Sequence, residues 1–381
     1  MILEISIKNF KSIKDSSTKF PKFIGAIVGK NAVGKTNLIQ AINFVRNLAT
    51  GIDTNTALKK IALTPQEIYN YNESSSNIEI KVQIATEDEN KYLLELTISP
   101  VNGEEGIQNL LIKSETLKSF DNNDIQTVVF KRNDSVLMDK DGNNIPLAVE
   151  QNKLALSLYQ ESNALKVKNT FSNIFVPDQD SVDFRESIVK SDEKGLASLI
   201  VRLRQSNPAS FEQFQKIIKK LLPHFSSIVE IPSKQPTNSP DSENLFMVLL
   251  EEENLKGKLS MKSVSAGDLR TLYIIASAMY LKPNSSFIFE EIENGLHPKR
   301  LKDLLDHLTT ISRKKDMQII FTTHSSAVIN LLSPSDVVYV EREIINGTQF
   351  HLLADSSHIT QIDNALKEGI SLTDYIFSRL Q

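Results

Sequence analysis

Eight consecutive residues near the start of the chain, Gly29 to Thr36, have the types and spacing needed to hold a polyphosphate. They read GKNAVGKT and fit the phosphate-loop pattern G-x-x-x-x-G-K-[ST] at every position. Glycines let the backbone curl so that several N–H groups point at one anion. The ammonium of Lys35 would reach the β- and γ-phosphates of a nucleotide, and the hydroxyl of Thr36 would bind Mg²⁺. The predicted nucleotide-binding residues of this loop are Gly29, Asn31, Gly34, Lys35, Thr36 and Asn37.

Two carboxylates follow a second apolar stretch, in the run FIFEE at residues 287–291. Beside a phosphate loop, Glu290 would hold Mg²⁺ through a water molecule, and Glu291 would orient or deprotonate the attacking water. His324 follows a third apolar stretch at residues 319–321. A lone histidine is more often structural, but its place directly after a core strand favours contact with the γ-phosphate. We therefore predict Lys35, Glu291 and His324 as catalytic residues, and Thr36 and Glu290 as metal-binding residues.

A serine-glycine turn, SAGDLR at residues 265–270, precedes a predicted helix from Leu269 to Leu281. Ser265 would cap this helix, and Gly267 would permit a close approach of the backbone. Alone, the turn indicates only the start of a helix. Together with the phosphate loop and the paired acids, it looks like a signature motif that presents N–H groups and a hydroxyl to a nucleotide.

The elements around these residues must bring them to one edge of a sheet. Residues 23–28 read as a buried strand and Asn37 to Leu48 as a helix, whose N-terminus would face the phosphates. Residues 246–250, 287–289 and 319–321 are further short apolar strands bracketed by helices, which is typical of a parallel sheet covered on both faces. Ligands of such sheets bind at the carboxyl ends of the strands.

We predict four regions along the chain. They are a nucleotide-binding lobe at 1–150 with antiparallel strands from about residue 77, a helical lobe and linker at 151–244, the rest of the nucleotide-binding core at 245–345, and a tail at 346–381. The linker is the segment 233–242, which is rich in proline and serine. The final stretch, Ile359 to Leu380, reads as a pair of helices for packing or for binding a partner.

Composition narrows the class of protein. The 381 residues contain no cysteine, so disulfides and thiolate zinc sites are excluded. Apolar stretches stay well below the roughly 20 residues that span a bilayer, and the N-terminus lacks the profile of a signal peptide, so we expect a cytoplasmic protein without membrane contact. A net charge of −4 gives no general argument for nucleic-acid binding, which stays open.

The order of these motifs resembles that of ABC-type ATPases. It is more closely similar to the SMC/RecF-like branch and to predicted bacterial ATPases related to the ATPase half of OLD-family nucleases. The matching segments are residues 7–12 (IKNFKS), 34–37 (GKTN), 291–298 (EIENGLHP) and 321–325 (FTTHS). The run EIENGLHP is the most specific, and it corresponds to the end of the Walker B motif and the D-loop. The resemblance implies an α/β fold with an ABC-type P-loop ATPase head, which combines a mixed or parallel core sheet, an antiparallel β subdomain and a helical lobe.

The chain departs from this branch at two places. The branch usually has Asp-Glu where this chain has Glu290-Glu291, which bears on the rate of hydrolysis. The glutamine of the Q-loop has no clear counterpart, and Gln66 is the candidate. Residues 49–190 match the branch only in layout.

The resemblance also implies a mechanism. Two heads would sandwich two ATP molecules, with Ser265 and Gly267 of one subunit meeting the γ-phosphate held by Lys35 and Thr36 of the other. ATP would join a homodimer, and hydrolysis would release it. The tail after His324 is too short for a Toprim nuclease domain, so we expect an ATPase head that switches a protein partner, such as an effector nuclease in anti-phage defence. The alternatives are a RecF-like DNA-binding clamp in repair and a slowly hydrolysing, nucleotide-gated scaffold.

Overall fold

The computed structural model describes residues 1–62, 64–69, 77–103, 106–177, 185–190, 195–232, 245–253, 255, 257–355 and 359–379. The chain forms two compact units, each assembled from separate stretches of sequence. The first unit comprises Met1–Val176, Asn284–Glu291 and Met317–Gln381, and the second comprises Pro177–Pro283 and Ile292–Asp316. The predicted linker at 233–242 lies outside the described residues, and the region boundaries predicted at 150, 244 and 345 stay predictions.

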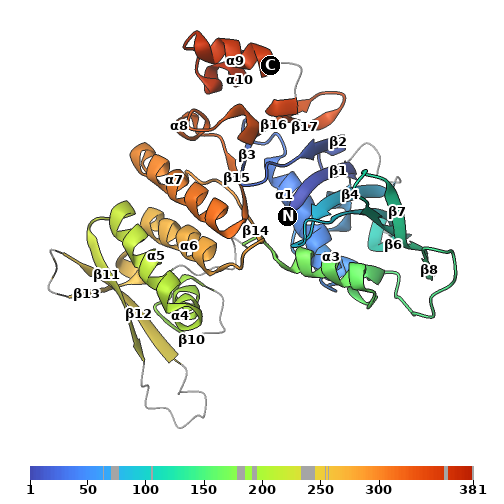
Figure 1. The fold of residues 1–381 in the computed structure, drawn as a ribbon, viewed down its shortest axis with the longest axis horizontal. Helices are drawn as coiled ribbons and strands as arrows, with labels where there is room; N and C mark the ends of the chain where they lie inside the picture. The colour runs from blue at the N-terminus through green and yellow to red at the C-terminus, as the bar shows by residue number, and fades with distance from the viewer. Residues whose placement is uncertain are drawn as a thin grey trace. The chain divides into compact units, whose positions relative to one another are not determined.

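Parallel strands from distant parts of the chain form the centre of the first unit (Figure 1). β3 (Ile24–Val28) pairs in parallel with β15 (Gln318–Thr323) and β16 (Val337–Glu343). β14 (Ser286–Phe289) pairs in parallel with β15 and with β9 (Ile174–Phe175). Every residue of β3, β14 and β15 is buried, as expected for short apolar strands covered on both faces. The strands predicted at 23–28, 287–289 and 319–321 are therefore confirmed.

The same sheet continues on one side as antiparallel strands. β4 shows why: its residues alternate between buried and more exposed, so only one face of this part of the sheet meets the core. The antiparallel hairpins predicted from about residue 77 are confirmed. These strands are β1 (Ile2–Phe10), β2 (Ile13–Lys19), β4 (Ile78–Ala85), β5 (Lys91–Gly103), β6 (Gly106–Phe120), β7 (Gln126–Asn133), β8 (Val136–Asp139) and β17 (Gly347–Leu352).

Helices complete the first unit. The predicted helix after the phosphate loop is α1, and the predicted terminal pair is present as α9 and α10. Apolar side chains of α1, including Leu38, Ile42 and Phe44, are buried in the main hydrophobic core. The helices are α1 (Lys35–Ala49), α2 (Thr54–Lys59), α3 (Ser162–Ser172), α8 (Ser326–Ile329), α9 (Ile359–Lys367) and α10 (Leu372–Arg379).

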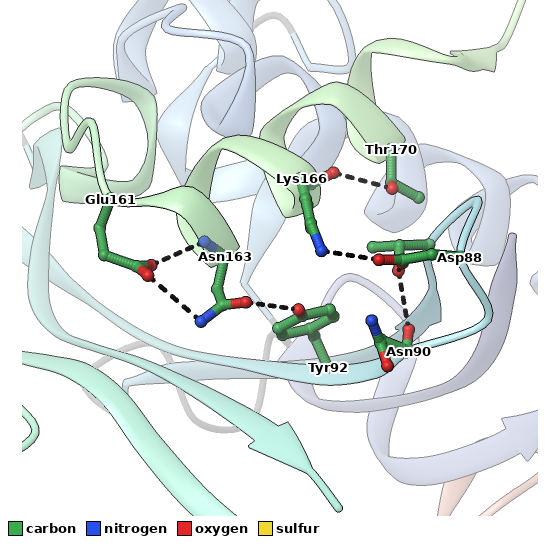
Figure 2. Close-up of polar contacts among 8 residues, drawn as sticks. Asp88, Asn90, Tyr92, Glu161, Asn163, Lys166 and Thr170 are labelled. Carbon is green, nitrogen blue, oxygen red and sulfur yellow. Dashed lines mark hydrogen bonds and ion pairs between the residues drawn. The ribbon is translucent and has the colours of Figure 1, made fainter.

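Polar contacts attach α3 to the turn between β4 and β5 (Figure 2). The ammonium of Lys166 donates to the carboxylate of Asp88 at 2.6 Å, and this hydrogen bond is the main reason that the pKa of Asp88 falls to about 2. The hydroxyl of Tyr92 donates to the side-chain oxygen of Asn163 at 2.8 Å. Since the Lys166–Asp88 pair is exposed, it adds little to stability.

The described residues of the second unit combine helices with a small antiparallel sheet (Figure 1). The strand predicted at 246–250 as part of the parallel sheet belongs instead to this sheet, so that prediction is wrong. Its run FMVLL is apolar at every position, and burial alternates only because the tertiary context covers one face. The elements are α4 (Leu196–Ser206), α5 (Pro208–Leu221), α6 (Ala266–Tyr280), α7 (Pro298–Lys315), β10 (Ile188–Lys190), β11 (Phe225–Pro232), β12 (Leu245–Glu252) and β13 (Lys258–Ser260).

The end of α7 holds the end of α6. The ammonium of Lys315 donates to the carbonyl oxygens of Ala278 at 3.0 Å, Met279 at 2.9 Å and Leu281. These carbonyls belong to the last turn of α6 and to its C-cap residue, where they lack partners within the helix, so a cation there satisfies them. Throughout the described part of the chain, the helices are too short or too polar to cross a membrane.

Candidate nucleotide-binding site

The phosphate loop connects the end of β3 to the start of α1 and leaves no room for side chains at its two glycines. Gly34 has a φ of 112°, in the left-handed region that favours glycine. A Cβ added to Gly34 would overlap the hydroxyl oxygen of Thr348, and one added to Gly29 would overlap the carbonyl oxygen of Val340. Backbone conformation and close packing therefore both require glycine in this loop.

The loop and helix α1 together present positive charge. The ammonium of Lys35 donates to the carbonyl oxygens of Gly29 and Lys30, each at 2.7 Å, so it lies against the loop itself. Asn31 and Thr36 are exposed. Among the described residues, none caps the N-terminus of α1 with its side chain. The N–H groups of the first turn, together with the helix dipole, suit a phosphate anion.

Thr36 and Glu290 lie in direct contact. The hydroxyl of Thr36, in the first turn of α1, donates to a carboxylate oxygen of Glu290 at 2.6 Å. Glu290 directly follows β14, so the contact joins the carboxyl end of a parallel strand to the phosphate loop. A hydroxyl and one carboxylate beside a phosphate site fit Mg²⁺, which keeps several waters and takes few protein ligands.

Glu291 has a left-handed backbone, with a φ of 50°. For a residue other than glycine, this conformation costs about 1–3 kcal/mol and persists where the surroundings impose it. Here the N–H of Glu291 donates to the hydroxyl oxygen of Thr322 on β15 at 2.8 Å. His324 follows Thr322 by two residues, and the side chains of Glu291 and His324 are both exposed. This hydrogen bond therefore joins the end of β14, which precedes Glu291, to the end of β15, which precedes His324.

The signature turn belongs to the second unit and is held by its own hydrogen bonds. Ser265 caps α6, as predicted, by accepting from the N–H of Asp268 at 3.1 Å, and its hydroxyl donates to the Asp268 carboxylate at 2.7 Å. Arg300 on α7 donates to the other oxygen of that carboxylate at 2.5 Å, and Nε2 of His224 lies 3.5 Å from the oxygen that Ser265 contacts. The hydroxyl of Ser265 therefore has a fixed orientation, while the residue itself is exposed.

Gly267 packs against the turn that carries the EIENGLHP run. A Cβ added to Gly267 would overlap the carbonyl oxygen of Gly295, whose own φ of 75° favours glycine. The close backbone approach predicted at Gly267 is therefore present, and the neighbouring backbone is that of Gly295. The signature turn at residues 265–270 and the segment around Gly295, which corresponds to the D-loop, therefore pack against each other within the second unit.

Sequence reasoning missed several residues that support these motifs. Asp268 follows Ser265 at the spacing of a capping box and could have been found from that spacing, whereas Arg300 and His224, which lie against its carboxylate, belong to no local pattern. The side-chain amide of Asn37, predicted at the nucleotide, donates to the hydroxyl oxygen of Ser12 at 2.6 Å. Gln66, the Q-loop candidate, is exposed on the short 3₁₀ helix Pro65–Ile68, and its role stays a prediction.

A phosphate loop between a buried parallel strand and a helix, with an acid-bearing strand end against it, defines a P-loop ATPase of the ABC type. A family model described as "AAA domain, putative AbiEii toxin, Type IV TA system" matches residues 24–330. The chain belongs to this family. It is an ATPase, and its motifs resemble those of the SMC/RecF-like branch.

Known proteins similar to this chain agree with that class. A protein of Helicobacter pylori called "ATP/GTP phosphatase" is 23% identical over 374 residues, with 94% of each chain covered. The crystal structure of an SMC head bound to the C-terminal winged-helix domain of ScpA matches with a TM-score of 0.56 and 15% identity, covering 92% of this chain and 96% of that one. At this identity the second match shows a shared fold.

Proposed function

We propose that the protein is an Mg²⁺-dependent ATPase in which ATP joins two copies of the chain and hydrolysis releases them. The observation that carries this proposal is the signature turn. Ser265 is exposed, yet its hydroxyl is oriented by the Asp268 carboxylate, which Arg300 holds in turn. A polar group fixed in place at a surface suits recognition of a ligand presented by another molecule. The γ-phosphate of an ATP bound to a second copy is the ligand that we propose.

Each predicted site residue has a role in this proposal. Lys35 and the N–H groups of the phosphate loop bind the β- and γ-phosphates. Thr36 and Glu290 hold Mg²⁺, which neutralises charge on the phosphates when it is bound. Glu291 orients the attacking water and accepts its proton, and His324 contacts the γ-phosphate. Asn31 and Gly267 line the nucleotide from the two copies.

Two variants test the proposal. We expect Lys35→Ala to abolish ATP binding, measured by titration calorimetry with ATP and Mg²⁺. We expect Glu291→Gln to bind ATP but not to hydrolyse it, and to elute from size exclusion with light scattering as a dimer only when ATP is present. Failure of the wild-type protein to bind ATP would overturn the proposed function. Normal ATP hydrolysis by Glu291→Gln would overturn the role proposed for Glu291.

We further propose that the ATP-bound dimer acts on a protein partner, such as an effector nuclease in defence against phage. The family description names a toxin of a toxin–antitoxin system, and the similar SMC head was solved with a domain of another protein; both support a protein partner. A pull-down from the native host with Glu291→Gln, compared with Lys35→Ala, should recover that partner only with the former. ATPase stimulation by DNA, with a steep salt dependence, would instead favour a DNA clamp.

A further inference from the structure

A chain of three side chains lies behind the phosphate loop in the first unit. The amide nitrogen of Asn37 lies 2.6 Å from the hydroxyl oxygen of Ser12, which lies 2.7 Å from the hydroxyl oxygen of Thr348. The Thr348 oxygen in turn lies 2.7 Å from the carbonyl oxygen of Val33, within the loop. Thr348 is fully buried. It comes from β17, more than 300 positions after the loop in sequence.

The direction of these hydrogen bonds follows from the chemistry of the groups. A carbonyl oxygen only accepts, so the single hydroxyl proton of Thr348 must go to Val33. Ser12 must then donate its proton to Thr348, and Asn37 must donate to Ser12. Hydrogen bonds that point the same way along a chain polarise one another and strengthen each member. The chain therefore ends on one loop carbonyl and holds it firmly.

Fixing the carbonyl of Val33 also fixes the N–H of Gly34. The two groups belong to one planar trans peptide, in which C=O and N–H point in opposite directions. With the carbonyl held toward Thr348, the N–H of Gly34 points to the opposite side of the loop. The lack of space for a Cβ at Gly34, against Thr348 and Ser12, shows how closely this peptide rests on the two hydroxyls.

We propose that Thr348 is a positioning residue for the phosphate loop, and that it orients the Gly34 N–H toward a bound phosphate. This inference rests on the proposed binding of ATP. Thr348 touches no nucleotide in this arrangement; it acts through Val33, and Ser12 and Asn37 support it. The hydroxyl at position 348 is thus a requirement for nucleotide affinity that comes from outside the loop motif.

Thr348→Val tests the proposal because it keeps the shape of the side chain and removes the hydroxyl. Loss of one buried hydrogen bond should raise the Kd for ATPγS with Mg²⁺ about tenfold in titration calorimetry. Thr348→Ser keeps the hydroxyl and should stay within about twofold of wild type. Thr18→Val is the matched control: Thr18 is buried on β2 in the same unit, and its hydroxyl donates to the carbonyl of Lys19 rather than to the loop.

Two further measurements separate positioning from a loss of stability. Unfolding temperatures without nucleotide show what each variant does to the fold, and the KM for ATP should rise in Thr348→Val while remaining near wild type in Thr18→Val. If Thr348→Val raises Kd no more than Thr18→Val does, the proposal is overturned, even though wild type binds ATP. Failure of wild type itself to bind ATPγS would instead overturn the proposed function.

Ser12→Ala provides a second route should Thr348→Val fold poorly. It removes the donor to Thr348 and should raise Kd less than Thr348→Val does, because the bond to Val33 can persist. In the double variant, the two effects should combine to less than their product, since both act on one chain of hydrogen bonds. A Ser12→Ala protein with wild-type affinity for ATPγS would contradict the proposed role of this chain of hydrogen bonds.

Discussion

The side chain of Glu290 is one methylene longer than the aspartate that the resembled ATPases usually carry, and its length has a visible consequence. Its carboxylate reaches the hydroxyl of Thr36 directly, at 2.6 Å. A hydrogen bond from a hydroxyl to a carboxylate is charge-assisted and holds both partners. The two residues proposed to hold Mg²⁺ are therefore placed together by the protein itself.

We expect the charge of Glu290 to matter more than its hydrogen bond. Glu290→Gln can still accept from Thr36 through its amide oxygen, but it removes the negative charge that attracts Mg²⁺. The Kd for ATPγS should rise about tenfold or more in saturating Mg²⁺ relative to wild type. In EDTA the two proteins should bind the nucleotide alike. Titration calorimetry under both conditions measures the difference.

Glu290→Asp is the control for the side-chain length. It keeps the charge, so Mg²⁺-dependent binding should fall less than in Glu290→Gln, although the carboxylate no longer reaches Thr36. Equal loss of affinity in EDTA and in Mg²⁺ for Glu290→Gln would show that the residue supports the loop instead of the metal.

At the level of single residues, the sequence predicts features that depend on the spacing of residues within short motifs. The conformations and packing of Gly29 and Gly34, and the contact of Thr36 with Glu290, agree with expectations drawn from short motifs. Thr348 and Arg300 could not be predicted, because their partners are hundreds or tens of positions away and no fixed spacing links them. Only the paired strands bring Thr348 to the loop.

Among the elements, strands β6 and β7 carry a buried ion pair that organises the segment leading to α3. The carboxylate of Glu115 accepts the N–H groups of Ala155 at 2.7 Å and Leu156 at 2.8 Å, one on each oxygen. Arg132, 3.8 Å away, donates to three backbone carbonyls, those of Asp134, Lys153 and Glu150. Both side chains are fully buried. Together they satisfy backbone groups of the segment before α3 and of the turn that follows β7.

Burial raises the pKa of Glu115 to about 7, although hydrogen bonds from Leu156 and Ala155 and the charge of Arg132 oppose it. The folded state therefore keeps this proton up to about pH 7, while the unfolded chain releases it near 4.5. The stability that Glu115 contributes is present below pH 4.5 and is lost as the pH rises through 7.

Glu115→Gln should isolate this effect. At pH 5 both oxygens of the protonated Glu115 carboxyl can still accept a hydrogen bond, whereas the Gln amide offers one acceptor oxygen for the two N–H groups, so the variant should be about 1–3 kcal/mol less stable than wild type. Because only wild type loses stability with rising pH, the gap should narrow between pH 5 and pH 8. Urea unfolding followed by circular dichroism at several pH values measures the gap.

Glu95→Gln on β5 is the matched control for this series. Burial raises the pKa of Glu95, but the hydrogen bond and charge of Lys118, with those of Lys81, outweigh it and lower the pKa below its ordinary 4.5. Its effect on stability should therefore be constant between pH 5 and pH 8. A Glu115→Gln gap that widens with pH would contradict a raised pKa at Glu115.

Elements whose sequence pattern is periodic or bounded by clear turns can be predicted from sequence. For β12, the sequence predicts a strand but not the sheet to which it belongs. Its run FMVLL carries no alternation that would distinguish an antiparallel strand from a parallel one. Pairing with β11 and β10 makes β12 an antiparallel strand. β10 is short, and the local sequence carries no pattern that predicts it.

For the whole molecule, the proposed site has its two halves in different compact units. The phosphate loop, Glu290, Glu291 and His324 belong to the first unit, and Ser265 and Gly267 belong to the second. If ATP is sandwiched between two copies, each site combines the first unit of one copy with the second unit of the other. Two different inactive variants can then complement each other when they form a mixed dimer.

Mixing Lys35→Ala with Ser265→Arg should therefore restore ATPase activity. In a mixed dimer, one site carries both defects and the other carries neither. An equal mixture that assorts at random contains about one quarter of the wild-type number of intact sites. The steady-state rate of phosphate release should accordingly recover to about one quarter of the wild-type rate. Ser265 also caps α6, so unfolding temperatures are measured first, and Ser265→Asn, which keeps a capping side chain, serves as a second variant.

Mixing Lys35→Ala with Glu291→Gln is the matched control, because both residues belong to the first unit. Every site in this mixture lacks either the lysine or the glutamate, so no activity should return. Recovery in both mixtures would point to exchange of damaged protein or to incomplete inactivation. No recovery in either, with all variants folded, would place Ser265 in the same site as the phosphate loop of its own chain or outside the site altogether, and the ATP-sandwiched dimer would have to be abandoned.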